Sequence, residues 1–473
     1  MDLVQITKSY VVLSAILAFA SVAAYLPTRD RRYIRWGLLI FLVISAGAFS
    51  PTPIIFFTAV FFIILVVTRG RGVVDLLVTY VVLYPLMPVT IEPFITLPVI
   101  HVTVSMIYPK LLWIVLLLPL FVKTVAFGNF RGLYWRYDRY IILFLFYSVI
   151  ILFRDRTALS ALGGLFYLFL SFYLPYFLFS REVKSEKDCS SIFSGMAFMG
   201  FFLGSVGLFE ILSNWKVYSH LVSHLNNIGV RYAYRAGLLR SAGPEGNAIA
   251  FGCFLMLIVP AVTYLICKKP AEKINYLFLV FTVVGTASTL TTTPFVAIIV
   301  FYLVFVILTV QRRESIVGGV LVTAIAILML PFSMVFISQS TVDYRQELLL
   351  HSMPVIKRSP LTGSGTYMME EELHLPIGDN SLDLTNNYLY MALRYGLAGL
   401  SIYLLIFMSA IYWLWMSIGR SDKPDEKLGG ALLLSSVVGI LIMMASIAQP
   451  TYVYGYLFVF LGLITAYVKS HEI

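Results

Sequence analysis

Three arginines stand close together in one polar stretch of the chain, at Arg231, Arg235 and Arg240. A guanidinium presents a planar fork of donors that matches the oxygens of a phosphate group. On a helix, Arg231 and Arg235 would share a face, because they are one turn apart. We therefore expect Arg240 to act directly on a diphosphate group, with Arg231 and Arg235 as further binding residues. Contact with lipid headgroups is the alternative.

A second polar stretch, 339–386, supplies further candidates. An amphipathic helix from Asp343 to Ile356 carries Arg345, a further candidate for the catalytic site. The glycine-rich turn 362–366 follows, and it either contacts phosphate or only reverses the chain. A carboxylate or an imidazole can accept a proton from an attacking hydroxyl. The candidates for this acceptor side of the reaction are His374, Asp379 and Asp383.

A third group of candidates opens the long apolar run that begins near residue 386. Asn386 and Asn387 can cap a helix there, and Tyr388 suits the interface between membrane and water. Arg394 lies one to two turns inside the run. An ionisable residue in a span is a functional candidate by default, although a long arginine can also extend to the interface. We predict that these four residues bind substrate.

The elements that must position these residues are membrane helices. The chain has 473 residues, of which 60% are hydrophobic and only 12% are charged. Repeated apolar runs of about 17–25 residues match the thickness of a bilayer. We predict an all-α polytopic membrane protein, a bundle of about 12–15 helices with a large, partly helical outer loop. The expected spans lie near 9–26, 36–49, 52–68, 73–89, 110–126, 139–153, 158–180, 190–212, 246–266, 274–290, 294–310, 316–337, 388–417, 428–447 and 452–468.

Basic residues give this bundle an orientation. They gather in short loops that fall on one side if the spans alternate, and the positive-inside rule assigns that side to the cytoplasm. These loops account for the net charge of +10, so no nucleic acid is expected as a partner. Arginines on the opposite face run against the rule and need another reason. The predicted divisions are 1–212 (N-terminal bundle), 213–245 (first outer loop), 246–338 (middle spans), 339–386 (large outer loop) and 387–473 (C-terminal spans).

Other function classes find less support. There is no Walker loop, no GxGxxG and no HExxH, and the three cysteines have no metal spacing, so we expect neither a cofactor nor a metal ion. A transporter would need charged or broken helices within the membrane. Asp75, Glu210 and Arg394 are the main charged residues in the predicted spans, and none has a clear partner. A structural scaffold would leave the outward-facing arginines unexplained.

Three motifs resemble those of the O-antigen ligase and polymerase superfamily. The run Arg240–Asn247 is similar to that family's arginine, glycine and asparagine run at the start of a span. Arg345, followed by the segment Pro354–Gly365, is similar to the pattern of an arginine, a helix and Pro-Leu-x-Gly-x-Gly. Asn386–Leu389, with the glycine-marked Tyr395–Leu400, is similar to the His-Asn-x-Tyr-Leu motif and the helix that follows it.

The chain departs from the family pattern at two places. Asn386 stands where the motif has a histidine that is proposed to engage the acceptor hydroxyl, and an asparagine cannot act as a general base. Thr291–Pro294 stands where the family tends to have an arginine after a Thr-Ser run. Both departures favour a mechanism that depends on stabilising the diphosphate. They also favour a polymerase or a divergent transferase over a ligase that acts on the lipid A core.

The resemblance implies a GT-C-like, metal-independent glycosyltransferase of the bacterial cytoplasmic (inner) membrane, with its catalytic loops on the periplasmic face. It implies transfer of a glycan from undecaprenyl diphosphate to a sugar hydroxyl, most simply by an O-antigen or exopolysaccharide polymerase. A ligase and a flippase or transporter of the same lipid-linked glycan remain the alternatives. The implied partners are the undecaprenyl diphosphate-linked oligosaccharide, an acceptor glycan, the lipid bilayer, a flippase and a chain-length regulator.

Overall fold

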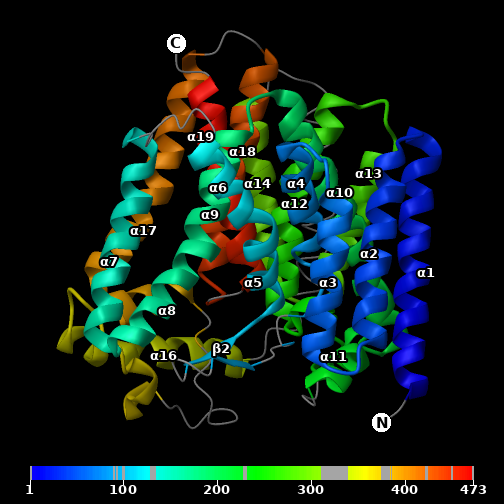
Figure 1. The fold of residues 1–473 in the computed structure, drawn as a ribbon. Coiled ribbons are helices and arrows are strands. Elements are labelled where there is room, and N and C mark those ends of the chain that lie inside the picture. Colours follow the sequence, from blue (N-terminus) through cyan, green and yellow to red (C-terminus); the bar gives the residue numbers. More distant parts are fainter. Residues whose placement is uncertain are drawn as a thin grey trace. The chain divides into compact units, whose positions relative to one another are not determined.

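The structure is a computed structural model, and it is almost entirely helical (Figure 1). It describes residues 3–88, 91, 94–97, 102–127, 135–226, 232–309, 339–373, 384, 386–420, 424–448 and 451–470. The chain forms two compact units, each of them discontinuous in sequence. Unit 1 comprises Met1–Asn129, Leu174–Phe295 and Thr451–Val459, and unit 2 comprises Phe130–Tyr173, Val296–Pro450 and Phe460–Ile473.

The prediction of an all-α polytopic membrane protein is confirmed. Within the described ranges, ten helices are long and apolar enough to cross a membrane. Backbone groups have no water partner in a bilayer, so each apolar run must form its hydrogen bonds internally as a helix. Shorter apolar helices are α3, α4 and α13, and the expected span at 316–337 lies outside the described residues.

Unit 1 contains most of the N-terminal and middle helices. Its core is α10, which packs against α13, α12 and α4. The helices are α1 (Leu3–Thr28), α2 (Arg31–Phe49), α3 (Pro53–Thr68), α4 (Val73–Leu83), α5 (Tyr108–Leu112), η1 (Trp113–Leu117), α6 (Leu118–Phe127), α9 (Leu174–Glu182), α10 (Glu186–Ser213), α11 (Tyr218–Asn226), η3 (Gly243–Glu245), α12 (Ala248–Lys268) and α13 (Ile274–Ser288).

Glycines let α10 and α13 approach closely. A Cβ atom on Gly204 would lie 2.2 Å from the carbonyl oxygen of Phe281, and one on Gly285 would lie 2.4 Å from the Cα of Gly204. Apolar burial does not drive helix association inside a lipid phase, so close backbone packing through small residues takes its place. This packing fixes the ends of α10 and α13, which carry the polar residues described below.

Unit 2 is organised around α17, which packs against α18, α7 and α16. The predicted amphipathic helix after residue 339 is present and ends at Arg358, immediately before Ser359 and Pro360. The elements are α7 (Trp135–Asp155), α8 (Ala158–Leu168), η2 (Phe169–Tyr173), α16 (Gln339–Arg358), η4 (Tyr367–Met369), η5 (Glu371–Leu373), α17 (Asn387–Arg420) and α18 (Pro424–Met444). Two helices, α14 (Thr292–Thr309) and α19 (Thr451–Ser470), pass from unit 1 into unit 2.

Two short antiparallel hairpins interrupt the helical pattern. β1 (Phe94–Leu97) pairs with β2 (Val102–Ser105), and β3 (Tyr234–Arg235) pairs with β4 (Leu238–Leu239). The β3–β4 turn holds Ala236 and Gly237, whose φ angles of 48° and 78° suit a type I′ hairpin turn. Arg235 therefore lies on a strand. The shared helical face considered for Arg231 and Arg235 does not apply to it, because Arg235 is in a strand and not on a helix.

Candidate functional site

Each unit holds one polar cluster that contains predicted site residues. The first, in unit 1, is called the arginine cluster and consists of Glu210, Lys216, Arg235, Arg240 and the turn 288–291. The β3–β4 hairpin brings both arginines onto that turn. The guanidinium of Arg235 donates through Nη1 to the carbonyl oxygen of Leu290 at 2.6 Å, and Arg240 donates through Nε to that of Thr289 at 3.1 Å.

Backbone bonds fix the position of Arg240 itself. Its N–H donates to the carbonyl oxygen of Ala233 at 2.9 Å, and the next residue, Ser241, donates its N–H to the carbonyl oxygen of Ser288 at 3.0 Å. The Oγ atoms of Ser241 and Ser288 are 2.5 Å apart. The backbone at Arg240 is thus tied on both sides, and the bond from Nε to Thr289 holds its guanidinium.

Part of the Arg240 guanidinium has no partner among the described residues. Its Nη2 atom is buried and has no hydrogen-bond partner among the described residues. Burial, together with the nearby charge of Arg235, lowers the pKa of Arg240 to about 10. The group is still cationic at neutral pH. Burial also lowers the pKa of Lys216. A half-buried cation with a buried, unused donor is a suitable receptor for an anionic oxygen.

Glu210 organises this cluster, and its role was not predicted. Its side chain is completely buried at the end of α10. Oε1 accepts a hydrogen bond from the N–H of Val217 at 3.0 Å, and Oε2 accepts from the N–H groups of Ala242 at 2.9 Å and Gly243 at 3.1 Å. The carboxylate is therefore used to join two loop segments, one of which follows Arg240 directly. An acidic residue in a predicted span was the only sequence signal for it.

A second buried carboxyl group, Glu245, lies just before α12. Burial raises its pKa to about 8, although the N–H of Tyr452 donates to it and acts in the opposite direction. Its Oε1 atom has no hydrogen-bond partner among the described residues. Asn247 caps α12 in the same segment, with Oδ1 accepting from the N–H of Ile249 at 2.8 Å. The motif around Arg240 thus supplies a helix start as well as a cation.

The second cluster, in unit 2, is called the helix-break cluster and consists of Tyr147, Arg154, Asp155, Arg394, Gly396 and the loop 359–366. Gly396 interrupts α17 with a φ of 69° and a ψ of −177°. The loop that follows α16 occupies this break. The N–H of Ser364 donates to the carbonyl oxygen of Leu393 at 2.8 Å, and that of Leu397 donates to Pro360 at 2.7 Å.

Glycine is required where the two backbones meet. A Cβ atom on Gly363 would lie 2.5 Å from the backbone nitrogen of Gly396, and one on Gly396 would lie 2.3 Å from the carbonyl oxygen of Leu361. The hydroxyl of Tyr147 lies 2.8 Å from the carbonyl oxygens of both Leu361 and Tyr395. The glycines of the turn at 362–366 therefore have a packing function, and its contact with phosphate remains a prediction.

Arg394 is buried in this cluster and is paired within it. Its Nη1 atom lies 3.4 Å from Oδ2 of Asp155 and donates to the carbonyl oxygen of Gly365 at 2.9 Å. Asp155, at the end of α7, was absent from the predicted site. The binding of substrate by Arg394 is untested, and its position is set by internal contacts.

The other predicted residues occupy varied environments. Arg345 is exposed on α16. Asn386 caps α17, because its Oδ1 accepts from the N–H of Tyr388 at 2.9 Å, as predicted. Asn387 donates to the hydroxyl of Tyr403 at 3.0 Å, and the hydroxyl of Tyr388 donates to the carbonyl oxygen of Leu441 at 2.5 Å. Four predicted residues lie outside the described part of the chain, namely Arg231, His374, Asp379 and Asp383.

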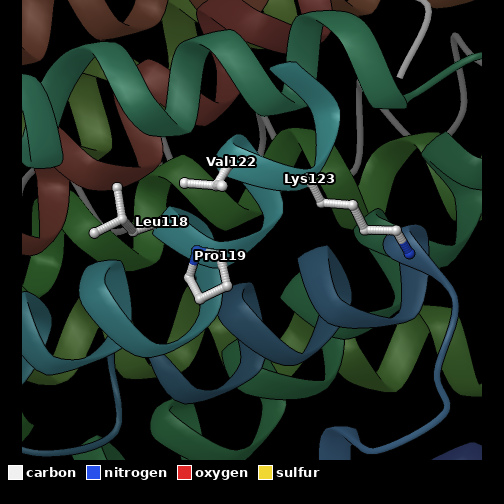
Figure 2. A pocket seen from close by; sticks show the side chains of 4 residues that line it. All are labelled: Leu118, Pro119, Val122 and Lys123. Atoms are coloured by element: carbon white, nitrogen blue, oxygen red, sulfur yellow. The ribbon is translucent and has the colours of Figure 1, made fainter. Parts of the chain in front are cut away.

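A pocket of about 630 Å³ lies in unit 1 along α6. Figure 2 shows its lining side chains, Leu118, Pro119, Val122 and Lys123, all from a single helix. The lining is almost wholly apolar, with one ammonium group at the edge. The pocket shares no residue with either cluster.

The helices and the two clusters define a multi-pass membrane protein with buried cationic groups. Residues 277–404 match a family model that is described as O-Antigen ligase. This match bears out, over residues 277–404, the resemblance to the O-antigen ligase and polymerase superfamily that the motifs predicted. The matched segment contains the turn 288–291, α16 and the helix break, while Arg240 and Asp155 lie outside it. A search of curated proteins finds no match.

Proposed function

We propose that the protein is a glycosyltransferase of the bacterial inner membrane that transfers a glycan from undecaprenyl diphosphate to a sugar hydroxyl. The family match supports a role in the assembly of lipid-linked polysaccharide. The observation that carries the proposal is Arg240, a half-buried side chain that Thr289 holds through Nε and that retains a buried, unused Nη2 donor. This arrangement suits the diphosphate of such a donor.

The proposed reaction needs charge stabilisation above all. The acceptor oxygen forms a bond to the anomeric carbon, with inversion, while the bond from that carbon to the diphosphate oxygen breaks. Negative charge then grows on the leaving diphosphate, and a fixed cation in a site of low dielectric stabilises it. Arg240 and Arg235 are assigned to this role, and Arg345 on α16 is proposed as a further diphosphate-binding residue.

The acceptor hydroxyl must also lose its proton. Asn386 cannot take it, because an amide is not a base, and its side chain is used to cap α17. The proposed acceptor-side groups are therefore His374, Asp379 and Asp383. A diphosphate is a good leaving group, so a weak base is sufficient, and no metal ion is assigned to the reaction.

We further propose that the acceptor is the growing polysaccharide, which makes the protein a polymerase. A ligase that transfers to a lipid A core is the second candidate. The absence of a histidine at Asn386 favours the polymerase, because the acceptor group of the ligase motif is missing. A flippase and a chain-length regulator are the expected partners, and the loops 213–245 and 339–386 are proposed to face the periplasm.

The test is to reconstitute the protein in liposomes with lipid-linked repeat units. We expect longer glycans from the wild type and at least a hundredfold loss with Arg240→Ala, because a donor to the leaving group contributes roughly this much. Lys187→Ala is the matched control, since Lys187 is exposed at the other end of α10. Movement of the lipid without lengthening of the glycan would instead identify a transporter, and normal lengthening by Arg240→Ala would refute the assigned site.

A further inference from the structure

The geometry points to Asp155 and Arg394 as a pair of positioning residues that lock the loop 359–366 into the break of α17 and so hold α16 in place. The pair lies in unit 2 and is distinct from the arginine cluster. Its catalytic consequence rests on the proposed function, because α16 carries Arg345. The lock itself is a property of the fold and can be tested without any assay of activity.

The contacts of the pair converge on the loop from both sides. Arg394 reaches Gly365 at 2.9 Å and Asp155 at 3.4 Å through the same Nη1 atom. The other oxygen of Asp155, Oδ1, lies 2.5 Å from Nε of Arg154. Arg154 in turn donates through Nη1 to the carbonyl oxygen of Thr362 at 3.0 Å. One carboxylate thus orients two guanidinium groups, and each of them binds a carbonyl oxygen of the loop.

Steric contacts show that the loop rests directly on this carboxylate. A Cβ atom on Gly365 would lie 2.3 Å from the Cγ of Asp155. The side chains of Arg394 and Asp155 are only 10% and 9% exposed. Oδ2 of Asp155 has the ionic contact but no hydrogen bond among the described residues. Water therefore cannot replace either partner easily, and the loss of one partner leaves a buried charge unpaired.

The break in α17 explains why a lock is needed. Gly396 interrupts the helical hydrogen bonds, so nearby backbone groups need other partners. The loop supplies them at Ser364, which donates to Leu393, and at Pro360, which accepts from Leu397. Because the loop begins right after α16 ends at Arg358, a loop that leaves the break also releases the end of α16. Movement of α16 then moves Arg345.

The lock is tested by hydrogen exchange of the segments 360–366 and 393–398 in the full-length protein. We expect Asp155→Asn and Arg394→Gln each to accelerate exchange at Ser364 and Leu397 at least tenfold. The double variant should exchange more slowly than either single variant, because neither member of the buried Asp155–Arg394 pair is then charged. Arg394→Lys, which keeps the charge, should restore much of the protection. Arg156→Gln is the matched control, since Arg156 is exposed beside Asp155.

Exchange in the α10 segment of unit 1 reports whether each variant is folded. In polymerisation assays we expect Asp155→Asn to lower kcat at least tenfold and to leave the KM for the lipid-linked donor within twofold, because the displaced Arg345 acts mainly on the charge that develops as the diphosphate leaves. Unchanged exchange in both single variants overturns the lock. Faster exchange with normal kcat overturns its catalytic consequence. Failure of the Arg240→Ala test would remove the proposed function and leave the exchange result standing.

Discussion

Replacement of Glu210 by glutamine tests whether the loop that carries Arg240 is held by a single carboxylate. Glu210 accepts three backbone hydrogen bonds through two oxygens, and no water reaches it. A glutamine has one oxygen and one NH₂ group. If its oxygen faces Ala242 and Gly243, its NH₂ group faces the N–H of Val217, and two donors then oppose each other.

The magnitude follows from these contacts. A hydrogen bond to a charged group contributes about 1.5–3 kcal/mol. Glu210→Gln removes one such bond and converts the others into weaker neutral ones, so we expect a loss of about 2–4 kcal/mol in the free energy of unfolding. Arg240 lies two residues before Ala242, so we also expect polymer formation to fall at least tenfold.

The assay pairs denaturation of the protein in lipid–detergent micelles with glycan lengthening in liposomes. Glu186→Gln is the control, because Glu186 lies at the other end of α10 and its exposed carboxylate pairs with Lys268. A surface pair of this kind contributes about 0–1 kcal/mol. If Glu210→Gln were as stable and as active as the control, the idea that this carboxylate positions Arg240 would have to be abandoned.

Two further predictions concern single residues. Burial raises the pKa of Glu245 from its ordinary value to about 8, so the folded state prefers the neutral acid. The stability that this preference contributes is complete below the ordinary pKa and is lost as pH rises through about 8. Thermal unfolding should therefore show a decline in Tm between pH 6 and 9 that is reduced in Glu245→Gln. Equal slopes of Tm against pH in the two proteins would contradict the assignment. Gly396→Ala should destabilise the protein by more than about 2 kcal/mol. A left-handed φ alone costs about 1–2 kcal/mol for a residue with a Cβ, and the new Cβ atom would also meet the carbonyl oxygen of Leu361. Gly419→Ala, in the same helix with open space around it, should be neutral in the same unfolding experiment.

Local patterns predicted the helices and their ends. Apolar runs of bilayer length became helices because the membrane permits little else. The start of α17 was predictable because the side chain of Asn386 can accept hydrogen bonds from the N–H groups of the first helical turn, and it does so from Tyr388 and Leu389. The end of α16 at Arg358 was predictable because the Ser359–Pro360 pair that follows cannot continue a helix. These features depend on residues within one or two turns of each other.

The hairpin that carries Arg235 was missed because a four-residue strand pair has little pattern of its own. Only the Ala236–Gly237 turn marks it, and alanine at a positive φ is an unusual choice. The glycines at 363 and 365 were noticed as a turn, but nothing in their neighbourhood shows that the turn is inserted into another helix. Their partner, Gly396, lies in a run that otherwise has every property of a continuous span.

By itself, the sequence determined that this is a multi-pass helical membrane protein with cationic residues in its polar loops, and its motifs carried the resemblance that the family model bears out over residues 277–404. Only the tertiary structure decided which of those residues are fixed by hydrogen bonds or ion pairs, and which groups are their partners. Glu210 holds the segment after Arg240 from 32 residues away, and Arg154 reaches Thr362 across 208 residues. Such pairs form because helix packing brings distant loops together, and a buried carboxylate must then satisfy whichever donors it meets. Composition and spacing specify the donors and acceptors, whereas the packing chooses the partners.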